Sequence, residues 1–191
     1  MSFGFFALMF RMKYIKRWAL MRCNIDENLS EHSLETAFIA HALAEIGNRY
    51  FNKKYNSDRI ALKAMYHDAT EIMTGDMPTP VKYYDTNIRN AYAAVEKCAE
   101  EKILTLLPDE LAESYKEAFA LTEEEKKLIK AADKLCAYIK CANEVQSANI
   151  EFAHAEKATK AALESSKCEE LDYFMKHFLD AFFKPLDDIS L

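Results

Sequence analysis

Three ionisable residues, His67, Asp68 and Glu71, occur close together in the otherwise apolar stretch MYHDATEIM (65–73). On a helix, adjacent residues point about 100° apart, so His67 and Asp68 diverge around one edge and both reach a point beside it. Imidazole and carboxylate are both metal ligands, and burying either group unpaired costs free energy. The pattern predicts a divalent metal site. Glu71 lies one turn later, where it could orient or deprotonate a water.

Two ligands do not hold a catalytic ion, so further ligands must come from other helices. His32 opens a core-facing stripe in the stretch EHSLETAFIAHALAEIG (31–47), and Asp133 lies in the core-facing stripe of KKLIKAADKLCAYIK (126–140). A simpler interpretation remains open for both residues. A lone histidine on an apolar face is most often a packed core residue, and Asp133 has lysines near enough for an ordinary salt bridge.

Composition favours an all-α fold. The 191 residues contain 3 Gly and 4 Pro, too few for the turns of a many-stranded sheet protein, and half of them are hydrophobic. The length suits one domain, residues 1–191. We expect a helix that begins at a cap of Asn28 or Ser30 and stops at Gly47. Further helices are expected over 57–74, with Ser57 or Asp58 as the cap and Gly75 as the end, and over 85–107. A shorter helix follows Pro108, a Thr122–Glu125 capping box begins another, and two more cover roughly 150–166 and 168–183. The stretch GDMPTPVK (75–82) is expected to be an ordered loop.

Several function classes are disfavoured by composition. The net charge is −6, with the acidic residues dispersed, which argues against a partner that is a nucleic-acid polymer. Five cysteines without a C-x-x-C pair indicate neither a disulfide framework nor a thiolate zinc site, and they suit a reducing compartment. The apolar start MSFGFFALMF lacks the order of a signal peptide and is shorter than the about 20 residues of a membrane span. We expect a cytoplasmic protein that does not cross a membrane.

An ordered set of motifs covers most of the chain. These are IKRWALMR (15–22), NLSEHSLETAFIAHALA (28–44), ALKAMYHDATEIMTGDMPTPVKYY (61–84), EEKKLIKAADKLCAYIKC (124–141) and LDYFMKHF (171–178). The set resembles the HD-domain phosphohydrolase superfamily and, within it, the bacterial HD-domain 5′-deoxynucleotidases. HDATEIMTGDMPTPVK is the most specific of these motifs.

The resemblance implies a single HD-domain helical bundle, a homodimer, and a site with assigned roles. The ligands of one divalent metal ion (Co, Mn, Cu, Zn, Ni or Fe) would be His32, His67, Asp68 and Asp133. The catalytic residues would be Glu71, Asp76 and Arg17, with Glu71 and Asp76 handling the nucleophilic water and the leaving group. The substrate would contact Arg17 at its phosphate, Trp18 at its sugar, the run Asp76, Met77, Pro78 and Thr79 at its nucleoside end, and His32, Asp68 and Asp133 at the metal.

The resemblance therefore implies a metal-dependent 5′-deoxynucleotidase, in which metal-bound water attacks the phosphorus of a deoxyribonucleoside 5′-monophosphate. Arg17 suits the phosphate because guanidinium makes two-pronged contacts with phosphate oxygens. One alternative is an HD phosphohydrolase that acts on another nucleotide, such as a dNTP or a signalling nucleotide. Another is a non-catalytic helical protein that binds metal and senses a nucleotide. A triphosphate would need more cations than the motifs offer, and a sensor has no use for two extra acids beside the ligands.

Overall fold

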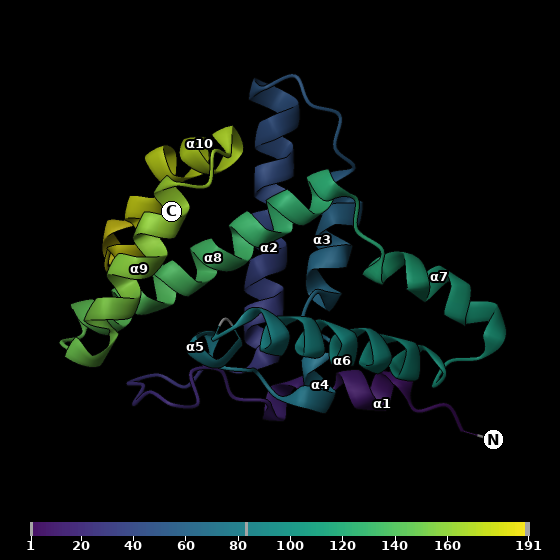
Figure 1. The fold of residues 1–191 in the computed structure, drawn as a ribbon. Coiled ribbons are helices and arrows are strands. Elements are labelled where there is room, and N and C mark those ends of the chain that lie inside the picture. The colour runs from purple at the N-terminus through teal and green to yellow at the C-terminus, as the bar shows by residue number, and fades with distance from the viewer. Residues whose placement is uncertain (1, 83, 190–191) are drawn as a thin grey trace.

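The computed structural model describes residues 2–82 and 84–189 of the chain. Within them, the regular elements are helices, with one isolated antiparallel bridge between Lys16 and Asn28 (Figure 1). The α-helices are α1 (Phe5–Met9), α2 (Leu29–Tyr50), α3 (Ser57–Tyr66), α4 (Glu71–Thr74), α5 (Thr79–Lys82), α6 (Thr86–Leu104), α7 (Asp109–Phe119), α8 (Glu123–Gln146), α9 (Ala153–Glu164) and α10 (Glu169–His177). The 3₁₀ helices are η1 (Met12–Tyr14), η2 (Ile150–Phe152), η3 (Leu179–Phe183) and η4 (Leu186–Asp188). The all-α prediction is confirmed, whereas the single-domain assignment stays a prediction.

Each of the two long helices that carry predicted ligands, α2 and α8, begins with a capping box. At α2, the Asn28 side chain accepts hydrogen bonds from the Ser30 and Glu31 N–H groups, and Glu31 accepts one from the Asn28 N–H. At α8, Thr122 and Glu125 form the same reciprocal arrangement, as predicted. Each box satisfies backbone donors that have no partner inside the helix.

The predicted stop of α2 at Gly47 is wrong, since the helix continues to Tyr50. A Cβ atom on Gly47 would lie 2.6 Å from Cε2 of Tyr55, so the glycine allows a ring to pack against the helix. The predicted cap of α3, Ser57 or Asp58, is also wrong by one or two residues. Asn56 begins the helix by accepting a hydrogen bond from the Arg59 N–H at 3.0 Å.

The continuous helix predicted over 57–74 is wrong. α3 ends at Tyr66, residues 67–70 form turns, and α4 follows. The His67 ring explains the break, because its Nδ1 lies 2.7 Å from the Ala64 carbonyl, which a continued helix would use for the Asp68 N–H. The next backbone hydrogen bonds span three residues, as from the Glu71 N–H to the Asp68 carbonyl at 2.9 Å. His67 and Asp68 therefore occupy a turn between two helices.

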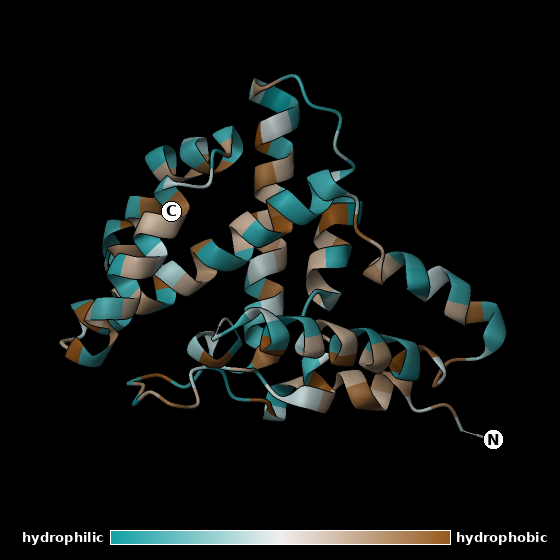
Figure 2. Ribbon diagram, viewed as in Figure 1, coloured by the Kyte–Doolittle hydropathy of each residue, from teal (hydrophilic) through white to brown (hydrophobic). Residues whose placement is uncertain are grey.

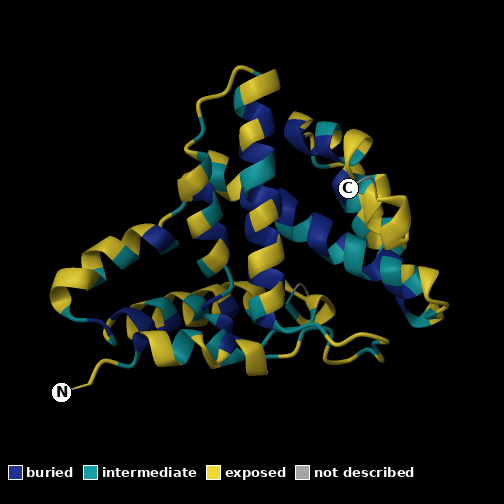
Figure 3. Ribbon diagram, turned by 180° about the vertical axis from the view of Figure 1, so that it is seen from behind, coloured by how far each residue is buried: buried dark blue, intermediate teal, exposed yellow. Residues whose placement is uncertain are grey.

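The main core forms where α2, α3 and α8 cross (Figure 1). The predicted stripe of α2 is buried, including His32, Thr36 and Leu43. Hydrophobic residues of the helices alternate with polar ones along these elements (Figure 2), and the buried residues follow one side of α2 and α8 (Figure 3). The C-terminal helices α9 and α10 pack against α8 and α2, respectively. The helices predicted over 150–166 and 168–183 are each divided into an α and a 3₁₀ part.

A second hydrophobic cluster joins α1 to the C-terminal end of α6. In it, Phe5 of α1 is fully buried with Ile103, Leu104 and Leu107. The loop predicted over 75–82 is wrong in its second half, because residues 79–82 form the short helix α5. Among the residues that the structure describes, no helix combines the length and apolar character needed to cross a membrane.

Candidate active site

The first predicted ligand, His32, lies in the opening turn of α2 and its side chain is fully buried. Its Nε2 lies 3.1 Å from Oδ1 of Asp133 and 3.6 Å from Oδ2 of Asp68. Its Nδ1 faces the Oε1 atom of Glu27 at 3.3 Å. The ring thus contacts carboxylates on both nitrogens, and two of those carboxylates belong to predicted ligands.

The second predicted ligand, His67, has one nitrogen held and the other free. A carbonyl can only accept, so the 2.7 Å contact with the Ala64 carbonyl requires a proton on Nδ1. Nε2 lies 3.0 Å from Oδ2 of Asp68 but is buried without a hydrogen-bond partner. This is the tautomer that leaves Nε2 to bind a metal, with the other nitrogen fixed by a backbone carbonyl.

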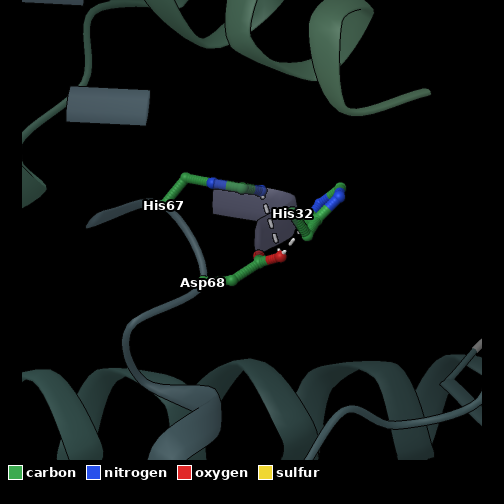
Figure 4. Close-up of side chains that lie close together, drawn as sticks. All are labelled: His32, His67 and Asp68. Carbon is green, nitrogen blue, oxygen red and sulfur yellow. Dashed lines mark ion pairs between the residues drawn. The ribbon is translucent and has the colours of Figure 1, made fainter. Parts of the chain in front are cut away.

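His32, His67 and Asp68 each offer a ligand atom, and these atoms all lie within 4.8 Å of one another (Figure 4). Asp133 of α8 lies outside this group of three but contacts the same nitrogen of His32. Burial opposes ionisation of Asp68, yet the charges of His67, His32 and Arg17 keep its pKa below its ordinary value. Burial also opposes ionisation of Asp133, and His32 again keeps the pKa low. Both carboxylates are therefore anionic.

The buried carboxylates of Asp68 and Asp133 give the site the negative charge that suits a cation. Burial lowers the pKa of His67, but the charge of Asp68 outweighs it and raises the pKa to about 9. Protons on the two imidazoles, whose pKa values are both raised, balance the buried carboxylates. A divalent cation bound by His32, His67, Asp68 and Asp133 would replace those protons, which is the usual coupling of metal binding to proton release. The donor set fits a divalent transition metal.

Glu71, the predicted water-handling residue, is the first residue of α4 and is 5% exposed. Its Oε2 atom is buried without a hydrogen-bond partner. Burial, followed by the charges of Asp68 and Asp76, raises the pKa of Glu71 to about 9. A carboxyl group that has an unpartnered oxygen and lies beside the predicted histidine and aspartate ligands is suited to exchange a proton with a water or a substrate.

Arg17 and Trp18 precede α2 and reach the site from the same short segment. Arg17 is largely buried, donates from Nε to Oε1 of Glu27 at 2.9 Å, and places Nη1 3.7 Å from Oδ2 of Asp68. Trp18 donates from Nε1 to Oε2 of Glu27 at 2.7 Å, and its ring packs against Phe152. Its backbone adopts φ 59°, a left-handed conformation that is rare for a bulky residue and marks a constrained position.

The remaining predicted residues form the loop that follows Gly75, whose φ of 74° suits glycine at the end of α4. Burial raises the pKa of Asp76, although the charge of Arg17 and the nearby Trp18 backbone N–H oppose this shift. Met77 and Pro78 are half-buried, and Thr79 is exposed at the start of α5. The structure therefore brings Asp76 to Arg17 and Trp18, and the loop continues from there to the surface.

Glu27 is the site residue that sequence reasoning missed. Its carboxylate contacts Arg17, Trp18 and His32, and its side chain is 10% exposed. Burial opposes ionisation, but His32 and Arg17 keep its pKa below the ordinary value. The signal available in the sequence was its place directly before the Asn28 cap, between two motifs that carry predicted site residues.

The fold is shared with solved HD-domain proteins. A HD-domain phosphohydrolase from Listeria innocua matches with a TM-score of 0.82 and 22% identity, covering 94% of this chain and 88% of that one. A cyanophage S-2L HD phosphohydrolase, solved with dA and one catalytic Zn²⁺ ion, matches with a TM-score of 0.63 and 21% identity, covering 94% of this chain and 96% of that one. The helical fold is that of the HD-domain phosphohydrolases.

Sequence comparison assigns the chain to a narrower family. A profile of the family described as 5′-deoxynucleotidase YfbR-like matches residues 4–182. The 5′-deoxynucleotidases YfbR of Shigella boydii and of Escherichia coli K12 are each 49% identical over 189 residues, which cover 97% of this chain and 95% of the relative. This chain belongs to the 5′-deoxynucleotidase YfbR-like family, and the predicted resemblance is confirmed.

Proposed function

We propose that this protein hydrolyses deoxyribonucleoside 5′-monophosphates to a deoxynucleoside and phosphate. The observation that carries the proposal is the cluster of His32, His67 and Asp68, with a buried Glu71 that has an unpartnered oxygen beside it. The relatives named 5′-deoxynucleotidase support the same activity.

The site suits one divalent ion held by His32, His67, Asp68 and Asp133, and the free Nε2 of His67 supports this assignment. A bound ion supplies a water of lowered pKa and neutralises phosphate charge. Mixed imidazole and carboxylate ligands without thiolate suit Co, Mn, Cu, Zn, Ni or Fe.

Each neighbouring side chain has a role that follows from its place. Glu71 has a raised pKa that a cation bound beside it would lower, so that its unpartnered oxygen would take a proton from the attacking water. Arg17 has Nε occupied by Glu27, which leaves its terminal nitrogens to hold and orient the phosphate. Asp76, whose pKa is raised by burial, gives a proton to the O5′ atom of the departing deoxynucleoside. The P–O5′ bond breaks as the water oxygen forms its bond to phosphorus.

Trp18 supports selectivity for the deoxy sugar. Its ring is fixed by the hydrogen bond to Glu27 and by packing on Phe152, so it makes a firm wall beside Arg17. A wall that contacts the sugar at C2′ leaves no room for a ribose hydroxyl. Asp76, Met77, Pro78 and Thr79 would contact the nucleoside end.

A monophosphate is favoured over the alternatives. Lys82, the cation that a longer phosphate chain would need, already forms an ion pair with Glu96 at 3.0 Å and stacks over the Tyr92 ring. A nucleotide sensor without turnover would gain nothing from Glu71, whose burial as a carboxyl costs free energy. The charges therefore support hydrolysis of a single phosphate.

The homodimer and the cytoplasmic location belong to the same proposal. Phe178 and Phe182 near the C-terminus and Phe6 and Phe10 at α1 are exposed, which gives apolar surface that a second copy would cover. Light scattering after gel filtration tests the dimer. Free cysteines at positions 23 and 98 suit a reducing cytoplasm, which cell fractionation tests.

The activity is tested by phosphate release. Protein loaded with Co²⁺ or Mn²⁺ is offered dNMPs, NMPs and dNTPs, and we expect release from dNMPs above all others. The Glu71→Gln variant should keep its affinity for metal and lose about 100-fold or more in kcat. Glu170→Gln is the matched control, since Glu170 is equally buried but bonds Tyr55 at the opposite end of α2. Absence of dNMP hydrolysis by the metal-loaded protein would refute the proposal.

A further inference from the structure

The carboxylate of Glu27 joins three parts of the site. Its Oε1 accepts a hydrogen bond from Arg17 Nε at 2.9 Å and faces His32 Nδ1 at 3.3 Å. Its Oε2 accepts a hydrogen bond from Trp18 Nε1 at 2.7 Å. One side chain thus contacts the residues that the proposed function gives to the phosphate, the sugar and the metal.

A carboxylate of this length reaches all three partners, with hydrogen bonds to Arg17 and Trp18 and an electrostatic contact with His32 Nδ1. Arg17 and Trp18 each donate an N–H group, His32 turns Nδ1 towards the same oxygen as Arg17, and a carboxylate offers two oxygens with about four lone-pair sites and no donor. A glutamine would turn an N–H₂ group towards at least one of these donors. An aspartate is shorter by one methylene and loses reach.

The backbone on either side of Glu27 is also fixed. The Arg17 N–H donates to the Glu27 carbonyl at 3.0 Å, and the Leu29 N–H donates to the Ile15 carbonyl at 3.0 Å, so the two segments lie antiparallel. The buried Glu144 of α8 accepts hydrogen bonds from the Asn24 and Ile25 N–H groups. The Glu27 carboxylate is therefore carried by a loop that is fastened to both α2 and α8.

We propose that Glu27 is a positioning residue that holds Arg17, Trp18 and His32 in one arrangement. The proposal rests on the proposed function for the roles of those three residues. The contact with His32 Nδ1 turns Nε2 towards Asp68 and Asp133. The bond to Arg17 Nε leaves the terminal guanidinium nitrogens free, and the bond to Trp18 holds an indole whose backbone is in a costly conformation.

Metal affinity and tryptophan fluorescence test the proposal without relying on turnover. Trp18 is the sole tryptophan in the sequence, so emission reports on this position alone. In Glu27→Ala we expect a red-shifted emission maximum and stronger quenching by acrylamide. Calorimetry with Mn²⁺ should show an affinity lower by about 10- to 100-fold, the effect typical of losing a carboxylate behind a ligating histidine.

Kinetics then separate the three contacts. For Glu27→Ala we expect KM for a dNMP to rise through Arg17 and the preference for dNMP over NMP to fall through Trp18. Glu27→Gln keeps the size of the side chain and one oxygen acceptor. We therefore expect smaller changes in KM and in the preference for dNMP over NMP than in Glu27→Ala. Glu27→Gln also covers the case in which the alanine variant does not fold, as judged by circular dichroism.

Glu35→Gln is the matched control, because Glu35 on α2 interacts electrostatically with His32 and Arg17 and is exposed, without the hydrogen bonds that Glu27 makes. If this control reproduces the changes, charge rather than positioning is responsible and the proposal is wrong. Unchanged fluorescence and metal affinity in both folded Glu27 variants would also overturn it. Wild-type protein that binds Mn²⁺ but does not hydrolyse dNMPs would refute the proposed function, while fluorescence and calorimetry would still decide the role of Glu27.

Discussion

Glu144 provides the sharpest test of how the site is supported. Its side chain is 2% exposed and lies at the end of α8. It accepts hydrogen bonds from the backbone N–H groups of Asn24 at 2.9 Å and Ile25 at 3.2 Å and from Asn149 Nδ2 at 2.8 Å, and it pairs with Lys140. Through these hydrogen bonds, one carboxylate links α8 to the loop that precedes α2.

The size of this effect follows from the pKa of Glu144. Burial opposes its ionisation, but Lys140, Asn149 and the two backbone donors outweigh burial and lower the pKa from 4.5 to about 2. That shift corresponds to about 3 kcal/mol of folding free energy. Because the folded pKa is depressed, the stabilisation is complete above the unfolded pKa and is lost as the pH falls from about 4.5 towards 2. In Glu144→Gln, we expect the free energy of unfolding at pH 7 to fall by about 3 kcal/mol.

Urea unfolding followed by circular dichroism, in the presence of a chelator, measures this difference. The gap between wild type and Glu144→Gln should be widest at pH 7 and should narrow below pH ~4.5, since the wild-type carboxylate then gains a proton. Glu164→Gln, at an exposed position, should change the free energy by less than about 0.5 kcal/mol. A gap that is the same at every pH, or that is smaller than about 1 kcal/mol at pH 7, would refute this account.

Three further changes test the packing and one tests the metal. Gly47→Ala should lower the free energy of unfolding by about 1–3 kcal/mol in urea titrations, because its Cβ would lie 2.6 Å from the Tyr55 ring; a neutral effect would show that the ring moves freely. Lys63→Met should cost about 3 kcal/mol in the same titrations, since it leaves Glu125 without the buried ammonium 2.6 Å away, and the double variant with Glu125→Gln should be less destabilised than the sum of the single changes. Thr122→Ala should lower the melting temperature through a loss of about 1 kcal/mol at the α8 cap, whereas a loss equal to that of Lys63→Met would contradict a purely local role. Adding Mn²⁺ to chelator-treated protein should raise the melting temperature in proportion to the logarithm of free metal, and a constant melting temperature would exclude a site in the folded protein.

The features that depend on residues near one another in the sequence agree with the predictions. The capping box of Thr122 and Glu125 and the buried stripe of α2 follow from contacts within one turn of a helix, which the sequence order determines directly. The assignments that failed depend on distant atoms or on a competing side chain. Gly47 is explained by the Tyr55 ring, and the helix break at His67 by its ring bonding to a carbonyl that the helix needed.

The same division applies to the site. The sequence by itself determined the family and the all-α fold. Its resemblance to the family predicted the grouping of His32, His67 and Asp68, because these residues lie in motifs that persist as a pattern along the chain. Only the tertiary structure placed Glu27 between Arg17, Trp18 and His32, and Glu144 beneath the same loop. Such roles require two segments distant in sequence to meet at hydrogen-bonding distance. Their positions are set by packing of the whole chain, and no local spacing encodes them.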